Sequence, residues 1–245
     1  MKQRGSPLIF SLGFFALTAQ TLLFRDFLVA FEGNELGLGA FFGAWFLWVA
    51  LGACGARFAR RMLGAHVPLL ALLYLPAYAL AHTLIAHSRA LAGVAAYEVF
   101  PYGRMLGLSL LTNAPVSAVT GMLFTLACAW WARLAARERG GHRALPVARV
   151  YILETLGAAA GGAFAVSLLA AGVTGQTVAL GAALVLSFGV VFAWPARVLR
   201  LAPAAVIAVA LLLNLGARWD EADARAAWAR LLPEEAYRGR FATAQ

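Results

Sequence analysis

The stretch that decides the fold is residues 150–194, VYILETLGAAAGGAFAVSLLAAGVTGQTVALGAALVLSFGVVFAW. Residues 155–196, which are 42 in number, contain no Asp, Glu, Lys or Arg. One bilayer crossing needs about 20 apolar residues, so this run is long enough for two crossings. Residues 171–177 (AGVTGQT) supply glycines and small polar side chains where the chain must reverse. The stretch therefore predicts a helical hairpin inside a membrane.

The composition places the whole chain in the same class. It is 62% hydrophobic and 13% charged, whereas a soluble domain carries about 25% charged residues. The net charge is +9, but the basic residues form short clusters between apolar runs, as membrane topology requires. The charge therefore indicates no nucleic-acid partner. Cys54 and Cys128 lie inside apolar runs, which favours small core residues over a disulfide or a metal site.

Apolar runs alternate with polar segments along the chain. Besides the two spans of the hairpin, we expect spans at residues 7–31, 36–56, 66–86, 105–131 and 201–217. The first is interpreted as a retained span, since it is longer than the apolar region of a signal peptide. Residues 88–104 are expected to form a loop or an interfacial helix. The predicted fold is an all-α polytopic bundle of about seven transmembrane helices over residues 1–217. A hydrophilic tail with a short amphipathic helix is expected at residues 218–245.

Lys and Arg are distributed unequally between the two sides of this topology. One side carries two Lys and Arg residues at the N-terminus and then three, five and two in successive loops. The opposite side carries two, both in residues 88–104. The positive-inside rule then predicts a cytoplasmic N-terminus in a bacterial-type cytoplasmic (inner) membrane. With an odd number of spans, the C-terminal tail would be periplasmic or extracellular.

Polar side chains inside spans are costly in lipid, so they are the candidates for function. Arg25 and Asp26 lie near the end of the first span, where they could line a cavity, pair with other helices or reach the interface; we favour a structural role. Glu154 lies one turn into the fifth span and could pair with Arg149 or Arg25, or face the cytoplasm. Such pairing is favoured over proton or substrate handling. The remaining candidates along a transport path are Gln20, Asn113 and Asn214.

Gly157, Gly161 and Gly162 follow Glu154 in the fifth span. G-x-x-x-G spacing places two glycines on one helix face and lets another helix pack closely. The sequence contains no H-E-x-x-H, P-loop, G-x-S-x-G or zinc-type cysteine motif. The four histidines, His66, His82, His87 and His142, are interpreted as interfacial rather than as haem ligands. No cofactor or metal is expected.

Several of these segments together resemble a known family. They are residues 15–25 (FALTAQTLLFR), residues 37–53, residues 151–162 (YILETLGAAAGG) and residues 237–241 (YRGRF). They are similar to the membrane-embedded spermidine synthase-like proteins. The resemblance implies a multi-spanning N-terminal region followed by an aminopropyltransferase-like domain. This chain stops at Gln245, where that domain would begin, so we expect no enzymatic activity of the chain itself.

Three functions are then open. The first is an integral membrane scaffold or accessory subunit that docks a protein partner within a membrane complex. The second is a small-solute transporter or channel, which requires polar groups on a common path through the membrane. The third is the membrane anchor of an aminopropyltransferase supplied by a separate chain. The sequence favours them in that order.

Overall fold

The computed structural model describes residues 2–31, 33, 35–64, 66–95, 98–138, 146–193, 207–208, 210 and 215–229. These residues form helices and connecting turns, and within them there is no strand. The all-α prediction is confirmed. Six helical segments of the described chain are long and apolar enough to cross a membrane.

The spans follow one another in the predicted order. They are α1 (Lys2–Ala30), α2 (Glu35–Leu63), a third span made of α3 (Val67–Leu70), η1 (Ala71–Leu73) and α4 (Tyr74–Ala86), α6 (Tyr102–Glu138), α7 (Pro146–Ala170) and α8 (Gly175–Ala193). The short α5 (Ser88–Ala92) follows α4, and α10 (Leu215–Ala229) lies near the C-terminus.

Large apolar side chains remain exposed on the outer faces of the bundle. Phe46 of α2 is 68% exposed, and Ile152, Leu156 and Val166 of α7 are also exposed. Exposed apolar surface on this scale is expected where lipid, rather than water, surrounds the protein. The protein is therefore a multi-pass membrane protein.

The third span contains an irregular turn at a proline. Pro76 cannot donate a backbone hydrogen bond to the carbonyl four residues earlier. The 3₁₀ segment η1 (Ala71–Leu73) lies in that preceding turn and tightens the helix there. Pro115, in contrast, lies inside the uninterrupted helix α6.

Residues 88–104 do not form a further span. After α5 the chain continues as a loop, and α6 begins at Tyr102. Arg89 donates hydrogen bonds to the carbonyl oxygens of Ala95 and Glu98, at 2.9 and 3.1 Å. Arg104 donates to the carbonyl oxygen of Ala92 at 2.9 Å. Arg89 and Arg104, the two basic residues on this side of the predicted topology, therefore stabilise the conformation of the loop.

The helical hairpin that decides the fold does not pack as a pair. α7 and α8 are joined by a turn at residues 171–174, with Gly172 at φ 81°, a conformation that favours glycine. Both helices pack along α1 and contact each other much less. The predicted hairpin connection is present, and α1 supplies most of its helix contacts.

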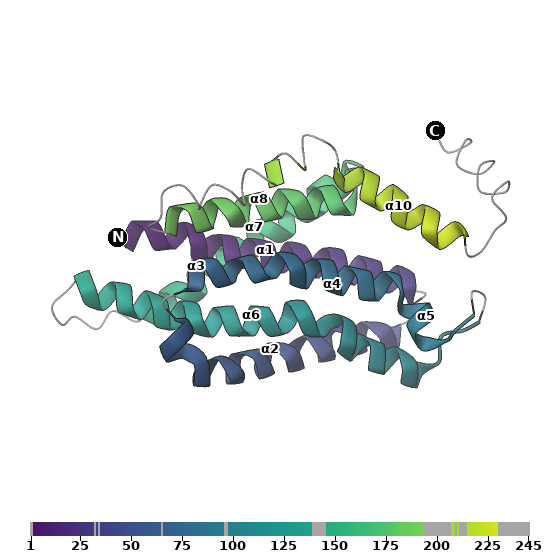
Figure 1. The fold of residues 1–245 in the computed structure, drawn as a ribbon, viewed down its shortest axis with the longest axis horizontal. Helices are drawn as coiled ribbons and strands as arrows, with labels where there is room; N and C mark the ends of the chain where they lie inside the picture. The colour runs from purple at the N-terminus through teal and green to yellow at the C-terminus, as the bar shows by residue number, and fades with distance from the viewer. Residues whose placement is uncertain are drawn as a thin grey trace.

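The six spans form two units of three helices (Figure 1). We call α1, α7 and α8 the α1 unit, and α6, α2 and the third span the α6 unit. In total, contacts within the units are more extensive than contacts between them, and the third span packs against α1 and α8 nearly as extensively as against α6. In the α1 unit, the central helix α1 packs along the parallel helix α7. In the α6 unit, the central helix α6 packs along the parallel helix α2. Each central helix also packs along one antiparallel helix, which is α8 for α1 and the third span for α6.

The two units run in opposite directions. Tyr74 of the third span contacts Phe15, and His82 contacts Asp26, so α1 and the third span are parallel. Tyr74 also bonds Thr120, near the middle of α6, whereas the end of α5 contacts the start of α6, so the third span and α6 are antiparallel. The central helices α1 and α6 are therefore antiparallel, and the α6 unit repeats the arrangement of the α1 unit with every direction reversed.

The predicted seventh span, residues 201–217, lies mostly outside the described residues. Its last residues, 215–217, belong to the start of α10. Gly189 near the end of α8 lies against Ser11, at the N-terminal end of α1, whereas Gly216 of α10 lies against Thr177 at the start of α8. The end of α8 and the start of α10 are therefore at opposite ends of the bundle (Figure 1).

Candidate functional site

Glycines bring α1 and α7 into backbone contact. A Cβ added at Gly157 would overlap the carbonyl oxygen of Phe10, and one added at Gly161 would overlap that of Phe14. From the other side, a Cβ at Gly13 would overlap the carbonyl oxygen of Glu154. Thr18 Oγ1 donates to the carbonyl oxygen of Gly161 at 3.0 Å. The structure thus places Gly157 and Gly161 at the α1–α7 contact, as small-xxx-small packing requires.

The candidate Gly162 contributes differently from its two neighbours. A Cβ there would lie 3.0 Å from the Cδ2 atom of the Leu17 side chain, rather than against backbone. A side chain can rotate away, so Gly162 constrains the helix contact less than Gly157 and Gly161 do.

The α6 unit contains the same kind of contact. A Cβ at Gly52 of α2 would overlap the carbonyl oxygen of Ala118, and one at Gly121 of α6 would overlap that of Val49. The contacting stretches share a sequence, since Leu51-Gly52-Ala53 in α2 matches Leu156-Gly157-Ala158 in α7. Each unit therefore holds its parallel pair by glycines on both helices.

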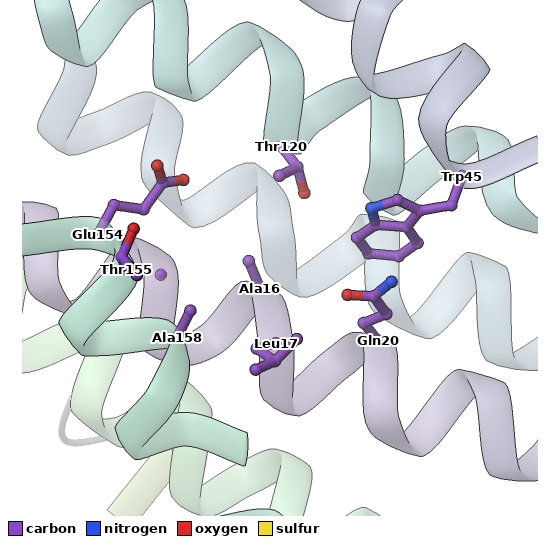
Figure 2. A pocket seen from close by; sticks show the side chains of 9 residues that line it. Ala16, Leu17, Gln20, Trp45, Thr120, Glu154, Thr155 and Ala158 are labelled. Carbon is purple, nitrogen blue, oxygen red and sulfur yellow. The ribbon is translucent and has the colours of Figure 1, made fainter. Parts of the chain in front are cut away.

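A cavity lies where the two units meet, which we call the central cavity (Figure 2). Its volume is about 210 Å³, and it opens to the surface of the bundle, where Thr155 is exposed. It is lined by four helices, α1, α2, α6 and α7, through Gly13, Ala16, Leu17, Gln20, Trp45, Thr120, Glu154, Thr155 and Ala158. Figure 2 shows Glu154 and Thr155 on one side, Trp45 and Gln20 on the other, and Thr120 between them.

Glu154 is the one ionisable side chain among the residues that line the central cavity. Within the described part of the chain its carboxylate has no hydrogen-bond or ion-pair partner. The two expected partners lie elsewhere. Arg149 lies over the ring of Trp131, with its guanidinium carbon 5.9 Å from the ring centroid. Gly13 of α1 contacts the backbone of Glu154, and Arg25 lies about 18 Å farther along the same helix. The predicted pairing of Glu154 with either arginine is therefore not seen.

Gln20 is the second unpartnered polar group of the central cavity. No hydrogen bond to its amide is formed by the residues that the structure describes. Thr120, in contrast, donates to the carbonyl oxygen of Val116 at 2.8 Å and accepts a bond from the Tyr74 hydroxyl at 3.1 Å. The cavity therefore offers a solute the Glu154 carboxylate and the Gln20 amide, together with the Thr155 hydroxyl and the Trp45 indole N–H, for which the described residues also form no hydrogen bond.

A second cavity of about 340 Å³ lies at the end of the bundle where α8 begins, and we call it the end cavity. Arg25 and Asp26 of α1 line it together with the turn between α7 and α8 and with Asp220 of α10. The structure thus separates the polar candidates into two groups. Gln20 and Glu154 share the central cavity, whereas Arg25 and Asp26 share the end cavity.

A buried histidine links three helices behind the end cavity. His82 Nδ1 lies 3.0 Å from Asp26 Oδ2, and His82 Nε2 lies 2.9 Å from Gln176 Nε2. An ionised carboxylate only accepts hydrogen bonds and an amide nitrogen only donates them. Nδ1 therefore carries the proton that is donated to Asp26, and Nε2 accepts from Gln176. This arrangement suits a neutral imidazole that joins α1, the third span and α8.

α10 covers this network from outside. The backbone N–H of Gln176, in the first turn of α8, donates to Asp220 Oδ2 at 3.1 Å. Trp219 packs edge-on against His82, with 5.9 Å between ring centroids. A carboxylate at a helix N-terminus is favourable because the first N–H groups have no partner within the helix. α10 is therefore fixed to the start of α8.

Asn113 belongs to neither cavity. It is buried in α6, and its amide nitrogen donates to the carbonyl oxygen of Ser109 at 2.9 Å. Within the described residues its side-chain oxygen has no partner. The remaining candidate, Asn214, lies outside the described residues.

Sequence reasoning missed Gln176, Trp45, Thr120 and Asp220. It interpreted His82 as interfacial, whereas His82 is buried between Asp26 and Gln176. His82 and Gln176 are polar residues within or beside apolar runs, and this signal would have identified them as candidates. Trp45 and Thr120 carry no such signal, because aromatic and hydroxyl side chains are common in spans. Their place in the central cavity depends on how the helices are rotated against each other.

Among the described residues, no group of three His, Cys, Asp or Glu side chains could hold a metal ion. No protein-family model, curated protein or solved structure matches the chain.

Proposed function

We propose that this protein is a transporter for a small polar solute. The observation that carries the proposal is the central cavity, at the contact of two oppositely directed three-helix units, with an unpartnered carboxylate inside it. An ionisable group within a membrane is costly and marks solute or ion pathways. In many transporters, units of inverted topology meet around a solute site near the middle of the bilayer.

The arrangement supports alternating access by a rocking motion. Glycine-mediated backbone contacts hold α1 to α7 and α2 to α6, so each of these helix pairs can move as one body. Contacts between the units are less extensive. Because Glu154 and Gln20 lie between the units, rocking would open their cavity to one side of the membrane and then to the other.

Cysteine accessibility tests this without knowledge of the solute. In a background with Cys54→Ala and Cys128→Ala, Thr155→Cys places one thiol in the central cavity. A charged, membrane-impermeant thiol reagent should modify it in right-side-out vesicles and also in inside-out vesicles. Val166→Cys is the matched control, because Val166 lies on α7, is 60% exposed and does not line the cavity. Reaction of Thr155→Cys from one side only, or from neither, would overturn the proposal.

A second candidate is the scaffold or accessory subunit, including an anchor for a separate aminopropyltransferase. One observation favours it. α10 is seated on the start of α8 and presents exposed polar groups, such as the ion pair of Arg225 with Glu221. Purification in mild detergent followed by mass spectrometry tests it. A stoichiometric partner that is lost with Glu221→Arg and Arg225→Glu would favour the scaffold, and a chain that is recovered alone would argue against it.

The orientation belongs to the same proposal. We place the N-terminus in the cytoplasm of a cell with a bacterial-type inner membrane, on the basis of the Lys and Arg distribution. α10 packs at the end of the bundle opposite the start of α1 (Figure 1), so it would then face the outside.

A further inference from the structure

We infer that the central cavity binds a linear solute with an ammonium group at one end and a neutral hydrogen-bonding group, such as a hydroxyl, at the other. The inference rests on the proposed function, because it names the solute class of the same cavity. It is carried by the unpartnered carboxylate of Glu154 and the unpartnered amide of Gln20 on opposite sides of that cavity, and by the mostly apolar surface between them.

The sign of the charge follows from Glu154. It is the one ionisable side chain that lines the cavity, and within the described residues no cation pairs with it. A negative charge in a low-dielectric site is stabilised by a cation that also donates hydrogen bonds. An ammonium group does both, whereas a carboxylate on the solute would be repelled.

The need for a second polar group follows from Gln20. Its amide lies with Trp45 on the opposite side of the cavity from Glu154 (Figure 2). A simple alkylammonium ion bound at Glu154 would leave that half-buried amide against an alkyl chain without a hydrogen-bond partner, which weakens binding. A hydroxyl at the far end of the solute would accept from and donate to the amide.

The middle of the cavity is mostly apolar, with Thr120 as a polar side chain between the two ends. Ala16 and Leu17 of α1 lie between the two polar ends, and the indole of Trp45 adds an aromatic surface. These side chains suit an alkyl segment. The volume of about 210 Å³ limits the solute to a short chain, since each liquid water molecule already occupies about 30 Å³.

Calorimetric titration of the full-length protein in detergent tests the inference with matched probes. Linear amino alcohols of increasing chain length are each compared with the alkylamine, the diol and the hydroxy acid of the same length. We expect the amino alcohol of the best length to bind most tightly and the hydroxy acid to show no binding. Equal binding of the diol, or tighter binding of the hydroxy acid, would overturn the inference.

Two variants test which cavity residue binds each end of the solute. Glu154→Gln should weaken binding of the amino alcohol at least about tenfold, because a hydrogen bond to a charged group is worth about 1.5–3 kcal/mol. Gln20→Leu should remove the preference for the amino alcohol over the alkylamine, because leucine offers the hydroxyl no hydrogen bond and leaves no unsatisfied amide against the alkyl chain. Glu35→Gln is the control, because Glu35 is an exposed carboxylate at the start of α2. Unchanged affinity in Glu154→Gln contradicts the charge assignment, and an unchanged preference in Gln20→Leu contradicts the second group.

The two proposals fail in different ways. If amino alcohols bind as expected but Thr155→Cys reacts from one side only, the cavity is a binding site without transport. If Thr155→Cys reacts from both sides but no ammonium probe binds, the transporter proposal stands and the solute class is wrong.

Discussion

At the residue scale, the difference between one glycine and another depends on what faces it. Gly157 and Gly121 lie against the backbone of a neighbouring helix, whereas Gly43 and Gly55 have open space where a Cβ would be. All four lie in apolar spans and are indistinguishable by composition. The same substitution should therefore have opposite effects at different glycines.

Gly157→Ala should lower the free energy of unfolding by about 1–3 kcal/mol, because the added methyl group separates α7 from α1. Gly43→Ala should raise it by up to about 1 kcal/mol, since alanine restricts the unfolded chain and meets nothing in the fold. Thermal or denaturant unfolding in detergent micelles measures both. If the two variants change stability in the same direction, close packing at Gly157 is not what holds the α1 unit together.

His82→Ala should lower the free energy of unfolding by about 1–3 kcal/mol, because it leaves Asp26 and Gln176 without their shared partner. His87→Ala is the matched control, since His87 is exposed, follows the last residue of α4 directly and bonds only the backbone carbonyl oxygen of Thr83 through its ring. The same unfolding measurement separates them. Equal losses in the two variants would mean that the link between three helices adds no stability.

At the element scale, α10 is the helix whose position depends on a few identified contacts. It is hydrophilic, it packs on α8, and Asp220 accepts the backbone N–H of Gln176. Its predicted counterpart was a short amphipathic helix in the tail after residue 217. In the structure this helix begins at Leu215, and Asp220 in its second turn lines the end cavity.

Asp220→Ala should loosen α10 and leave the six spans intact, because it removes the carboxylate that satisfies the start of α8. The expected cost is about 1 kcal/mol. Hydrogen exchange at residues 215–229 should become faster, with no change in α1 or α6. Glu221→Ala is the control, since its side chain is exposed and points to Arg225. Equally fast exchange in both variants would show that the contact with α8 does not hold α10.

At the scale of the whole molecule, the two three-helix units predict one main motion. A spin label at Val29 of α1 and one at Tyr102 of α6 report on the distance between units, whereas Leu38 of α2 and Tyr102 report within the α6 unit; all three side chains are exposed. Addition of solute, or of amino alcohol, should shift the distance distribution of the first pair and leave that of the second unchanged. Shifts in both pairs would mean that the units deform rather than rock.

The two ends of the bundle should also differ in their accessibility to a membrane-impermeant reagent. In the cysteine-free background, Arg225→Cys on α10 should react with an impermeant maleimide in intact cells, because α10 packs at the end opposite the start of α1. Arg57→Cys near the end of α2 should react after permeabilisation only. The reverse pattern would invert the proposed orientation, and equal reaction in intact cells would contradict the opposite placement of the two residues.

The sequence by itself determined the class of fold, the helical spans and the hairpin turn. Those properties depend on local composition, because a bilayer selects apolar segments of fixed length whatever their neighbours are. It also identified Gly157 and Gly161 as packing candidates and Gln20 and Glu154 as polar ones. The tertiary structure alone decided that α1 separates α7 from α8, that Glu154 faces Gln20 instead of an arginine, and that Asp26 meets His82. These outcomes depend on how helices far apart in the chain are rotated and placed against one another, and no local pattern of residues specifies that.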